Sequence, residues 1–279
     1  MFAKKYLFLV LLTAMAPGLF QCKQNIPKSD SIHVQESTLV AADPLLKLLT
    51  PQESGVSFEN RIEETFDVNI TTNINMYNGG GLAVFDMNND GLPDLFFIGS
   101  SGPNGLFLNE GNMKFRDITV SAGLTATEGF SADNGFETAA TAVDINADGF
   151  LDIYVCRSGP KAEDSRRNKL YVNNGDLTFT EKAAEYGLDD ISASTGANFF
   201  DYDNDGDLDL YLLNHPDSKT YTNLLEAKLG ADGKYHPNLE PHDEKHTDRF
   251  YRNDNGTFSD VTNQAGIRNY GYGLSVSVS

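Results

Sequence analysis

Three aspartate-rich nonapeptides recur along this 279-residue chain. Each carries an oxygen-bearing side chain at its first, third, fifth and ninth positions, and glycine at its sixth. Carboxylate and carboxamide oxygens on a tight loop form the ligand shell that hard cations prefer, and Ca²⁺ is the natural occupant. The first aspartates lie 58 and 57 residues apart, which indicates that a whole structural unit repeats with the loop. The three copies span residues 86–94, 144–152 and 201–209.

Two other interpretations of these strings compete with a calcium loop. A hydrated turn is one, because Asp, Asn and Gly are also common in turns, but three copies in one register favour a metal loop. An EF-hand is the other, and its twelfth position should hold a bidentate glutamate. That position holds Phe97, Val155 and Leu212 here, so each loop runs into an apolar strand instead.

The residues around each loop predict short β-strands. A glycine- or threonine-led apolar stretch precedes the loop, a β-rich run follows it, and a hairpin with an Asn/Asp/Gly turn comes next. Four short antiparallel strands in about 57 residues are typical of one propeller blade, so the predicted fold class is an all-β propeller with about four blades present. The preceding stretches are 79–85, 138–143 and 195–200, the following runs are 95–98, 153–155 and 210–213, the hairpins are 106–115, 170–179 and 250–258, and the closing Gly-centred triplets are 122–124, 186–188 and 265–267.

These units resemble FG-GAP/VCBS repeats, the blades of integrin-α-like propellers. Segments 77–94 and 201–211 resemble more closely the bacterial secreted VCBS-repeat proteins related to cartilage acidic protein, which often carry an ASPIC/UnbV-type domain that no segment here resembles. The resemblance covers about residues 45–279 and implies about three Ca²⁺ sites in a propeller outside the cell. The ligands that it implies are Asp86, Asn88, Asp90, the Leu92 carbonyl and Asp94; Asp144, Asn146, Asp148, the Phe150 carbonyl and Asp152; and Asp201, Asp203, Asp205, the Asp207 carbonyl and Asp209.

The N-terminus has the composition of a targeting segment. Two lysines precede an apolar run over 6–16 that is too short to span a bilayer, which predicts a signal peptide over 1–21. Cys22 follows in a sequence that resembles a bacterial lipobox, although Gln21 stands where a small residue is usual. We therefore expect an exported protein of the cell envelope, an outer-membrane lipoprotein with lipid on Cys22 and a polar tether over 22–44. The lipid is its only predicted membrane contact; cleaved secretion and an uncleaved anchor are the alternatives.

The charge distribution bears on partners. A net charge of −19 excludes nucleic acid, because no basic face is present to release counterions from phosphate. Eleven of the 40 acidic residues lie inside the three nonapeptides, so the acidity is local. Cys156 lies in an apolar run with no neighbouring histidine, which predicts a buried hydrophobic side chain and no catalytic thiol. Glycines 79–81 have no phosphate-loop continuation and predict close backbone packing.

The third unit carries an insertion over about 214–249 that holds four of the five histidines, His215, His236, His242 and His246. The last two are four residues apart and could bind a transition metal from one helical face; a solvated loop and a partner-binding loop are the alternatives. Residues 273–279 match the strand that precedes a metal loop, so we expect part of a seven-bladed or larger propeller. A four-bladed ring is the alternative.

The predicted function is a calcium-binding exported propeller that acts as a non-enzymatic scaffold or binding module for an extracellular protein or glycan. The sequence contains no nucleophile motif of the GxSxG type. Two alternatives are a calcium-stabilised propeller enzyme, a lyase or hydrolase of polysaccharide, and a structural component of the envelope. In all three the cations fasten carboxylates that would otherwise repel one another.

Overall fold

The structure is a computed structural model, and the sheets described here belong to its unit Leu48–Ser279. The predicted signal peptide, Cys22 and the tether lie outside the described residues, as do His242 and His246. The division into signal peptide, tether and propeller therefore stays a prediction. The described residues are 46–62, 64, 66, 69–70, 76–100, 102–124, 136–159, 166–215, 227–237, 247–267, 269, 271, 273 and 275–277.

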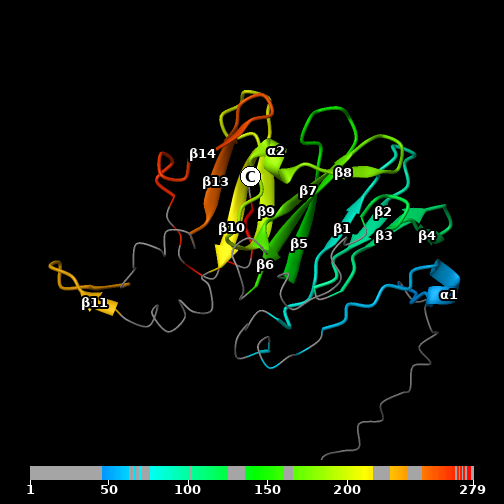
Figure 1. Ribbon diagram of the computed structural model, residues 1–279, viewed down its shortest axis with the longest axis horizontal. Coiled ribbons are helices and arrows are strands. Elements are labelled where there is room, and N and C mark those ends of the chain that lie inside the picture. Colours follow the sequence, from blue (N-terminus) through cyan, green and yellow to red (C-terminus); the bar gives the residue numbers. More distant parts are fainter. Residues whose placement is uncertain are drawn as a thin grey trace, which may run out of the picture. The chain divides into compact units, whose positions relative to one another are not determined.

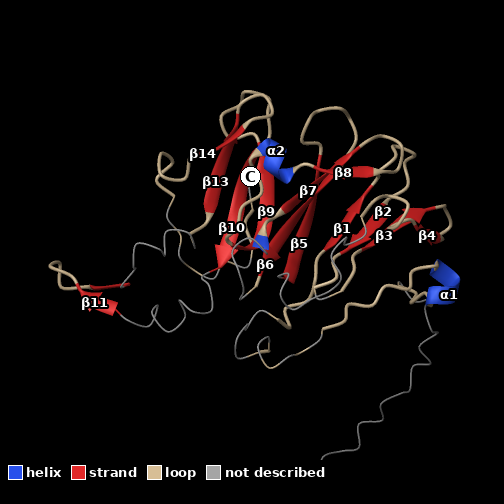
Figure 2. Ribbon diagram, viewed as in Figure 1, coloured by secondary structure: helices blue, strands red, loops and turns tan. Residues whose placement is uncertain are grey.

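Three four-stranded antiparallel sheets make up the described core. Their strands are labelled in Figure 1 and coloured as strands in Figure 2. In each sheet the nonapeptide joins the first strand to the second, and a hairpin joins the third to the fourth. This confirms the expected all-β, blade-like architecture. The first sheet holds β1 (Leu82–Phe85), β2 (Asp94–Phe97), β3 (Gly105–Asn109) and β4 (Phe115–Asp117); the second holds β5 (Phe136–Val143), β6 (Asp152–Ser158), β7 (Lys169–Asn173) and β8 (Phe179–Glu181); the third holds β9 (Ala193–Phe200), β10 (Asp209–His215), β13 (Arg249–Asn253) and β14 (Phe258–Asp260).

The second sheet is buried on both faces, and strand β6 shows how. Side chains alternate across a strand, so Ile153 and Val155 enter the cluster shared with the first sheet. Tyr154 and Cys156 enter the cluster shared with the third sheet. All four side chains are buried, which explains why β6 is a continuous apolar run. Burial raises the pKa of the Cys156 thiol well above its usual range, so this residue is the inert hydrophobic side chain that the sequence predicts.

The first strands of successive sheets lie close to one another. A Cβ on Gly81 would come within 2.8 Å of the Ala140 nitrogen in β5, and a Cβ on Gly80 within 2.1 Å of the Ile98 oxygen. These contacts confirm the close backbone packing expected of Gly80 and Gly81, whereas the expectation is wrong for Gly79, where a Cβ would meet nothing within 4 Å. The side-chain hydroxyl of Thr141 donates to the Ala197 oxygen of β9 at 3.0 Å.

The same inter-strand relation continues past the third sheet. The side-chain amide of Asn198, in β9, donates to the main-chain oxygen of Val276 at 3.0 Å. Residues 275–277 therefore lie beside β9 as β9 lies beside β5. This placement agrees with the sequence match between 273–279 and the strand that precedes each loop.

A one-turn segment ends each unit at a glycine in the left-handed region, and a fourth such turn precedes the first sheet. Helix α1 (Pro51–Ser54) ends at Gly55 with φ 85°, and helix α2 (Ala183–Tyr186) ends at Gly187 with φ 74°. Turns at Gly123 and Gly266 have φ 77° and 70°. Three of these glycines pack on the hairpin phenylalanine of the following sheet: a Cβ on Gly55, Gly123 or Gly187 would lie 2.1, 3.4 or 3.3 Å from the oxygen of Phe115, Phe179 or Phe258.

The insertion in the third sheet contains a small hairpin. Strands β11 (Ala227–Leu229) and β12 (Tyr235–Pro237) pair antiparallel between β10 and β13 in the sequence. His236 contacts Asp232 in the connecting turn, with its Nε2 at 2.9 Å from Oδ1. Among the described residues, neither helix is long and apolar enough to cross a membrane.

Candidate metal centres

The first loop, residues 86–94, is held by its own carboxylates. Asp86 accepts the main-chain N–H groups of Asp90 at 3.1 Å and of Gly91 at 2.7 Å, one on each carboxylate oxygen. Asp90 accepts the N–H of Leu92 at 2.8 Å. The side-chain amide of Asn88 donates to Asp90 at 2.9 Å. The loop therefore gathers its first, third and fifth side chains on one side of a tight turn.

The second loop, residues 144–152, repeats this network. Asp144 accepts the N–H groups of Asp148 at 3.1 Å and Gly149 at 3.0 Å, and Asp148 accepts the N–H of Phe150 at 2.8 Å. The side-chain amide of Asn146 donates to Asp148 at 2.9 Å. Two loops 58 residues apart therefore share one geometry.

The third loop, residues 201–209, keeps the same main-chain bonds with more charge. Asp201 accepts the N–H groups of Asp205 at 3.2 Å and Gly206 at 3.1 Å. Asp203 stands where the other loops have asparagine. Ligand oxygens of Asp201, Asp203 and Asp209 lie within 4.8 Å of one another, and this is the one such group of three among the described acidic, histidine and cysteine residues.

Two left-handed residues shape each loop. The sixth-position glycines have φ of 83°, 89° and 99°, which only glycine adopts without strain. The fourth position is also left-handed, at Asn89 (φ 61°), Ala147 (φ 56°) and Asn204 (φ 60°). Asparagine tolerates this conformation better than alanine does, so Ala147 is the strained member of the set.

The ninth-position aspartate joins the loop to the rest of its sheet, a role that the sequence did not reveal. Asp152 is fully buried and accepts the N–H of Ile145 at 3.0 Å and the N–H of Asn173 at 2.7 Å. Asp94 and Asp209 make the same two bonds in their sheets. Each carboxylate thus fixes the start of its loop, the start of the second strand and the end of the third.

Burial raises the pKa of all three ninth-position carboxyls above the usual value. For Asp152 burial raises the pKa to about 6, and the charges of Asp148 and Asp144 add to the shift. Its two N–H partners oppose the shift, because they stabilise the ionised form. Burial raises the pKa of Asp94 and Asp209 in the same direction. An ionised carboxylate in this position therefore lacks compensating positive charge.

A hairpin asparagine completes each site, and its repetition in the sequence was a usable signal. Asn109, Asn173 and Asn253 each end the third strand and donate their main-chain N–H to the buried aspartate. Each side-chain oxygen also accepts an N–H from the hairpin turn, at 2.9, 2.9 and 2.7 Å. The aspartate loop and the hairpin are consequently one hydrogen-bonded assembly.

The donor set fits calcium better than any softer metal. Every side chain at the four expected ligand positions offers carboxylate or carboxamide oxygen, and none of these positions carries sulfur or imidazole. The N–H of each seventh-position residue is held by the fifth-position aspartate, which orients the peptide that carries the expected carbonyl ligand. In the third loop the Asp207 side chain points elsewhere and accepts the N–H of Asn255 at 2.7 Å.

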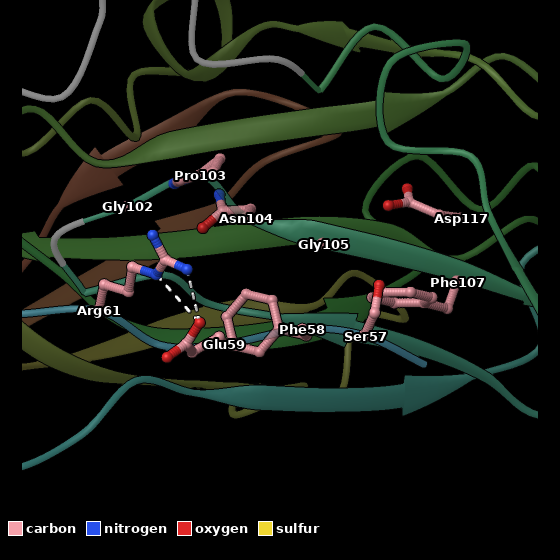
Figure 3. Close-up of a pocket in the computed structure, with 10 residues that line it drawn as sticks. All are labelled: Ser57, Phe58, Glu59, Arg61, Gly102, Pro103, Asn104, Gly105, Phe107 and Asp117. Atoms are coloured by element: carbon pink, nitrogen blue, oxygen red, sulfur yellow. Dashed lines mark hydrogen bonds and ion pairs between the residues drawn. The ribbon is translucent and has the colours of Figure 1, made fainter. Parts of the chain in front are cut away.

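A pocket of about 400 Å³ lies away from the loops, between the segment after α1 and the first sheet (Figure 3). Phe58 stacks on Phe97 with ring centroids 4.9 Å apart. Glu59 and Arg61 form an ion pair at 2.8 Å beside this ring. Asn104 is already engaged, since its side-chain amide donates to Glu137 at 2.6 Å. The pocket is lined by Ser57, Phe58, Glu59, Arg61, Gly102, Pro103, Asn104, Gly105, Phe107 and Asp117.

A second pocket, of about 370 Å³, lies where the first strands of the sheets begin. Buried His215 lines it, and its Nε2 is 2.6 Å from the oxygen of Gly273. The lining holds no carboxylate or cationic side chain beside the imidazole. Its members are Asn78, Gly79, Gly80, Thr138, Thr195, His215 and Gly273. His236 lies with Asp232 in the insertion hairpin instead, so the described histidines do not form one cluster.

Comparison with known proteins finds matches over the part of the chain that contains the three loops. The model of the FG-GAP-like repeat matches residues 86–155 and 144–212. Cartilage acidic protein 1 of Xenopus tropicalis is 29% identical over 192 residues, which are 64% of this chain and 28% of that protein. Integrin alpha-8 of Gallus gallus is 35% identical over 136 residues, 43% of this chain and 12% of that protein. The chain thus spans less than a third of the length of these relatives.

Among solved structures, an Agrocybe aegerita lectin described as recognising non-reducing terminal N-acetylglucosamine aligns with 64% of this chain and 36% of its own, at 18% identity and a TM-score of 0.32. The matches to the repeat model and to the two relatives agree with the three sheets and their shared loop geometry. Residues 86–212 of this chain thus match the FG-GAP-like repeat, and the chain is similar to integrin alpha-8 over 136 residues.

Proposed function

We propose that this protein is an exported propeller whose three aspartate loops bind Ca²⁺ and whose surface binds an extracellular protein or glycan without catalysis. The observation that carries the calcium assignment is the repetition of one oxygen-rich loop geometry in three sheets. The side chains that would hold the ions are Asp86, Asn88, Asp90 and Asp94; Asp144, Asn146, Asp148 and Asp152; and Asp201, Asp203, Asp205 and Asp209, with the carbonyls of Leu92, Phe150 and Asp207.

Electrostatics supports this assignment. The buried carboxyl of Asp152 has a pKa raised to about 6 by burial and by two neighbouring carboxylates. At neutral pH the ionised group is therefore destabilising unless a cation lies nearby. Bound Ca²⁺ supplies that positive charge, and each site then adds about 1.4 kcal/mol to stability at tenfold its dissociation constant.

The binding role rests on the scaffold and its relatives. The two pockets are lined by neutral, aromatic and a few charged side chains, which are suited to binding a ligand. Among the described residues that line them, none form a nucleophile–base pair. The relatives carry the names cartilage acidic protein and integrin, so we infer protein or glycan partners. The predicted signal peptide over 1–21 and the lipobox-like sequence at Cys22 support our inference that this module is an outer-membrane lipoprotein of the cell envelope.

Calcium binding is tested by thermal melting of the full chain with Ca²⁺ and with EDTA. Asp148→Ala removes a fifth-position ligand, and we expect it to reduce the calcium-dependent rise in melting temperature by roughly a third, since it removes one of about three equal increments. Asp176→Ala is the matched control, because it removes an exposed hairpin carboxylate outside the loops. Equal melting temperatures in Ca²⁺ and EDTA contradict the assignment.

The partner class is tested by screening the protein against a glycan array and against a panel of extracellular protein domains. Each screen is run in Ca²⁺ and in EDTA. Calcium-dependent binding without turnover supports a binding module. Cleavage of a polysaccharide that is lost on changing His242 or His246 supports the enzyme alternative instead.

A further inference from the structure

Two side-chain hydrogen bonds join the first loop to the second sheet, one of them directly to the second loop. The amide of Asn89, in the first loop, donates to the Gly149 oxygen of the second loop at 2.9 Å. The amide of Asn173, in the second sheet, donates to the Met87 oxygen of the first loop at 2.9 Å. Gly149 stands between the proposed ligands Asp148 and Phe150. Each bond therefore fixes a peptide that lies between two ligands of the other sheet's site.

The second of these bonds belongs to a continuous path. The carboxylate of Asp152 accepts the main-chain N–H of Asn173 at 2.7 Å. The side-chain amide of Asn173 donates to the main-chain oxygen of Met87. The N–H of Met87 in turn donates to Asp94 at 2.9 Å. A ninth-position ligand of the second loop is thus connected to that of the first through two intermediate residues.

The second and third loops lack this connection. Ala147 occupies the fourth position of the second loop and has no amide to donate. Asn253 matches Asn173, and each side-chain amide donates to an oxygen of its own sheet at 3.2 Å, Leu208 and Leu151 respectively. Asn173 also donates to Met87 of the preceding sheet, whereas the described contacts of Asn253 include no such bond to the second loop. Within the part of the chain that the structure describes, no side-chain hydrogen bond joins residues 144–152 to residues 201–209.

We propose that Ca²⁺ loading of the first and second loops is positively coupled through Asn89 and Asn173, and that the third loop loads independently. This inference rests on the proposed calcium sites and adds their regulation. A bound ion orders the loop that holds it, and the shared hydrogen bonds order part of the neighbouring loop as well. The second ion then meets a loop with less conformational entropy left to lose. Coupling of this kind changes affinity about 5-fold or more.

The test compares loop pairs by calorimetric titration of the full chain with Ca²⁺. Asp201→Asn with Asp205→Asn leaves the coupled pair, and Asp86→Asn with Asp90→Asn leaves the second and third loops. We expect the first variant to bind two ions with about 5-fold positive coupling and the second to bind two ions independently. Circular dichroism in Ca²⁺ establishes that each variant is folded.

A single substitution in the otherwise natural chain tests the same point where a double variant does not fold. Asn89→Gly removes the donating amide and keeps the left-handed backbone at φ 61°, so it should lower the coupling without removing a ligand. Asn204→Gly is the matched control in the third loop, where the residue has φ 60° and should leave the coupling unchanged.

The outcomes separate the two proposals. No Ca²⁺ uptake by any loop overturns the calcium assignment and the coupling together. Uptake of three independent ions overturns the coupling and leaves the calcium assignment standing. Equal cooperativity in both loop pairs, or coupling that survives Asn89→Gly unchanged, overturns the role given to the inter-loop bonds.

Discussion

The side-chain amide of Asn173 donates to the main-chain oxygen of Met87 at 2.9 Å, across 86 residues of sequence. Asn173 is only 3% exposed, and it also accepts the Gly175 N–H at 2.9 Å. One buried side chain therefore fastens its own hairpin and the aspartate loop of the preceding sheet. This bond ties the second sheet to the first loop, and among the described residues Asn253 makes no equivalent bond to the second loop.

Replacing Asn173 by aspartate should destabilise the protein by about 1–3 kcal/mol, because the Met87 oxygen loses its donor and two acceptors are brought together. The acceptor for the Gly175 N–H is kept, so the hairpin turn is spared. Denaturant unfolding in Ca²⁺ measures the change.

Asn253→Asp is the control for this variant, since Asn253 occupies the equivalent place and holds only its own sheet. We expect the loss at Asn173 to exceed the loss at Asn253. Equal losses would show that the bond to Met87 contributes nothing beyond the local turn.

The stability of the calcium-free protein should fall as the pH rises, because of the buried carboxyl of Asp152. Burial raises the pKa of this carboxyl to about 6 from 3.8, so between these values the folded state binds more protons than the unfolded state. The stability that protonation gives is complete below the lower value and is lost as the pH rises through about 6. Asp94 and Asp209 shift in the same direction and add to this trend.

Calcium reverses the dependence, because a ligand carboxylate must be ionised. The rise in melting temperature on adding Ca²⁺ should therefore be small at a pH of about 5 and larger at about 7. Melting curves in EDTA and in Ca²⁺ across this range measure both trends. A calcium effect of the same size at both pH values would contradict a role for Asp152 as a ligand.

Ala147 should be a site where substitution stabilises the protein. Its φ of 56° is left-handed, whereas the other two loops place asparagine there. The left-handed conformation costs a residue with a Cβ about 1 kcal/mol, so Ala147→Gly should raise the free energy of unfolding by about that amount. Ala184→Gly in helix α2 is the matched change and should lower it. A loss at both positions would exclude backbone strain at Ala147.

The sequence was sufficient to predict the sheets and the loops, because both depend on local patterns. Alternation and turn residues located each four-stranded unit, and the spacing of Asp144, Asn146 and Asp148 located a loop that the structure closes on itself. The strand after each loop follows the sequence prediction too, since Phe97, Val155 and Leu212 all lie in strands.

The connections between units were not predictable in the same way. Asp152 begins strand β6, and its burial depends on the pairing of β6 with β7. The spacing of residues within the loop does not reveal that pairing. The bond from Asn173 to Met87 depends on how two sheets pack, and no spacing in the sequence encodes that distance. The role of α1 was also missed, because its sequence shares only a terminal glycine with the other closing turns.

The docking of α1 on the first sheet yields the last prediction. Gly55 has φ 85°, and a Cβ there would lie 2.1 Å from the Phe115 oxygen. Gly79 has φ 86°, but a Cβ there would meet nothing within 4 Å. Substitution by alanine costs both positions about 1 kcal/mol for the left-handed backbone.

Only Gly55→Ala adds a collision with main-chain atoms. Movement of a side chain cannot relieve this collision, because the atoms belong to the backbone of Phe115. We expect a further loss of about 1–3 kcal/mol at this position. Denaturant unfolding of both variants measures the difference, and limited proteolysis reports whether the α1 segment has been released. If α1 did not pack on the hairpin at Phe115, the two alanine variants would be equally stable; a larger loss at Gly55 supports a closing turn that packs on the first sheet as Gly123 packs on the second.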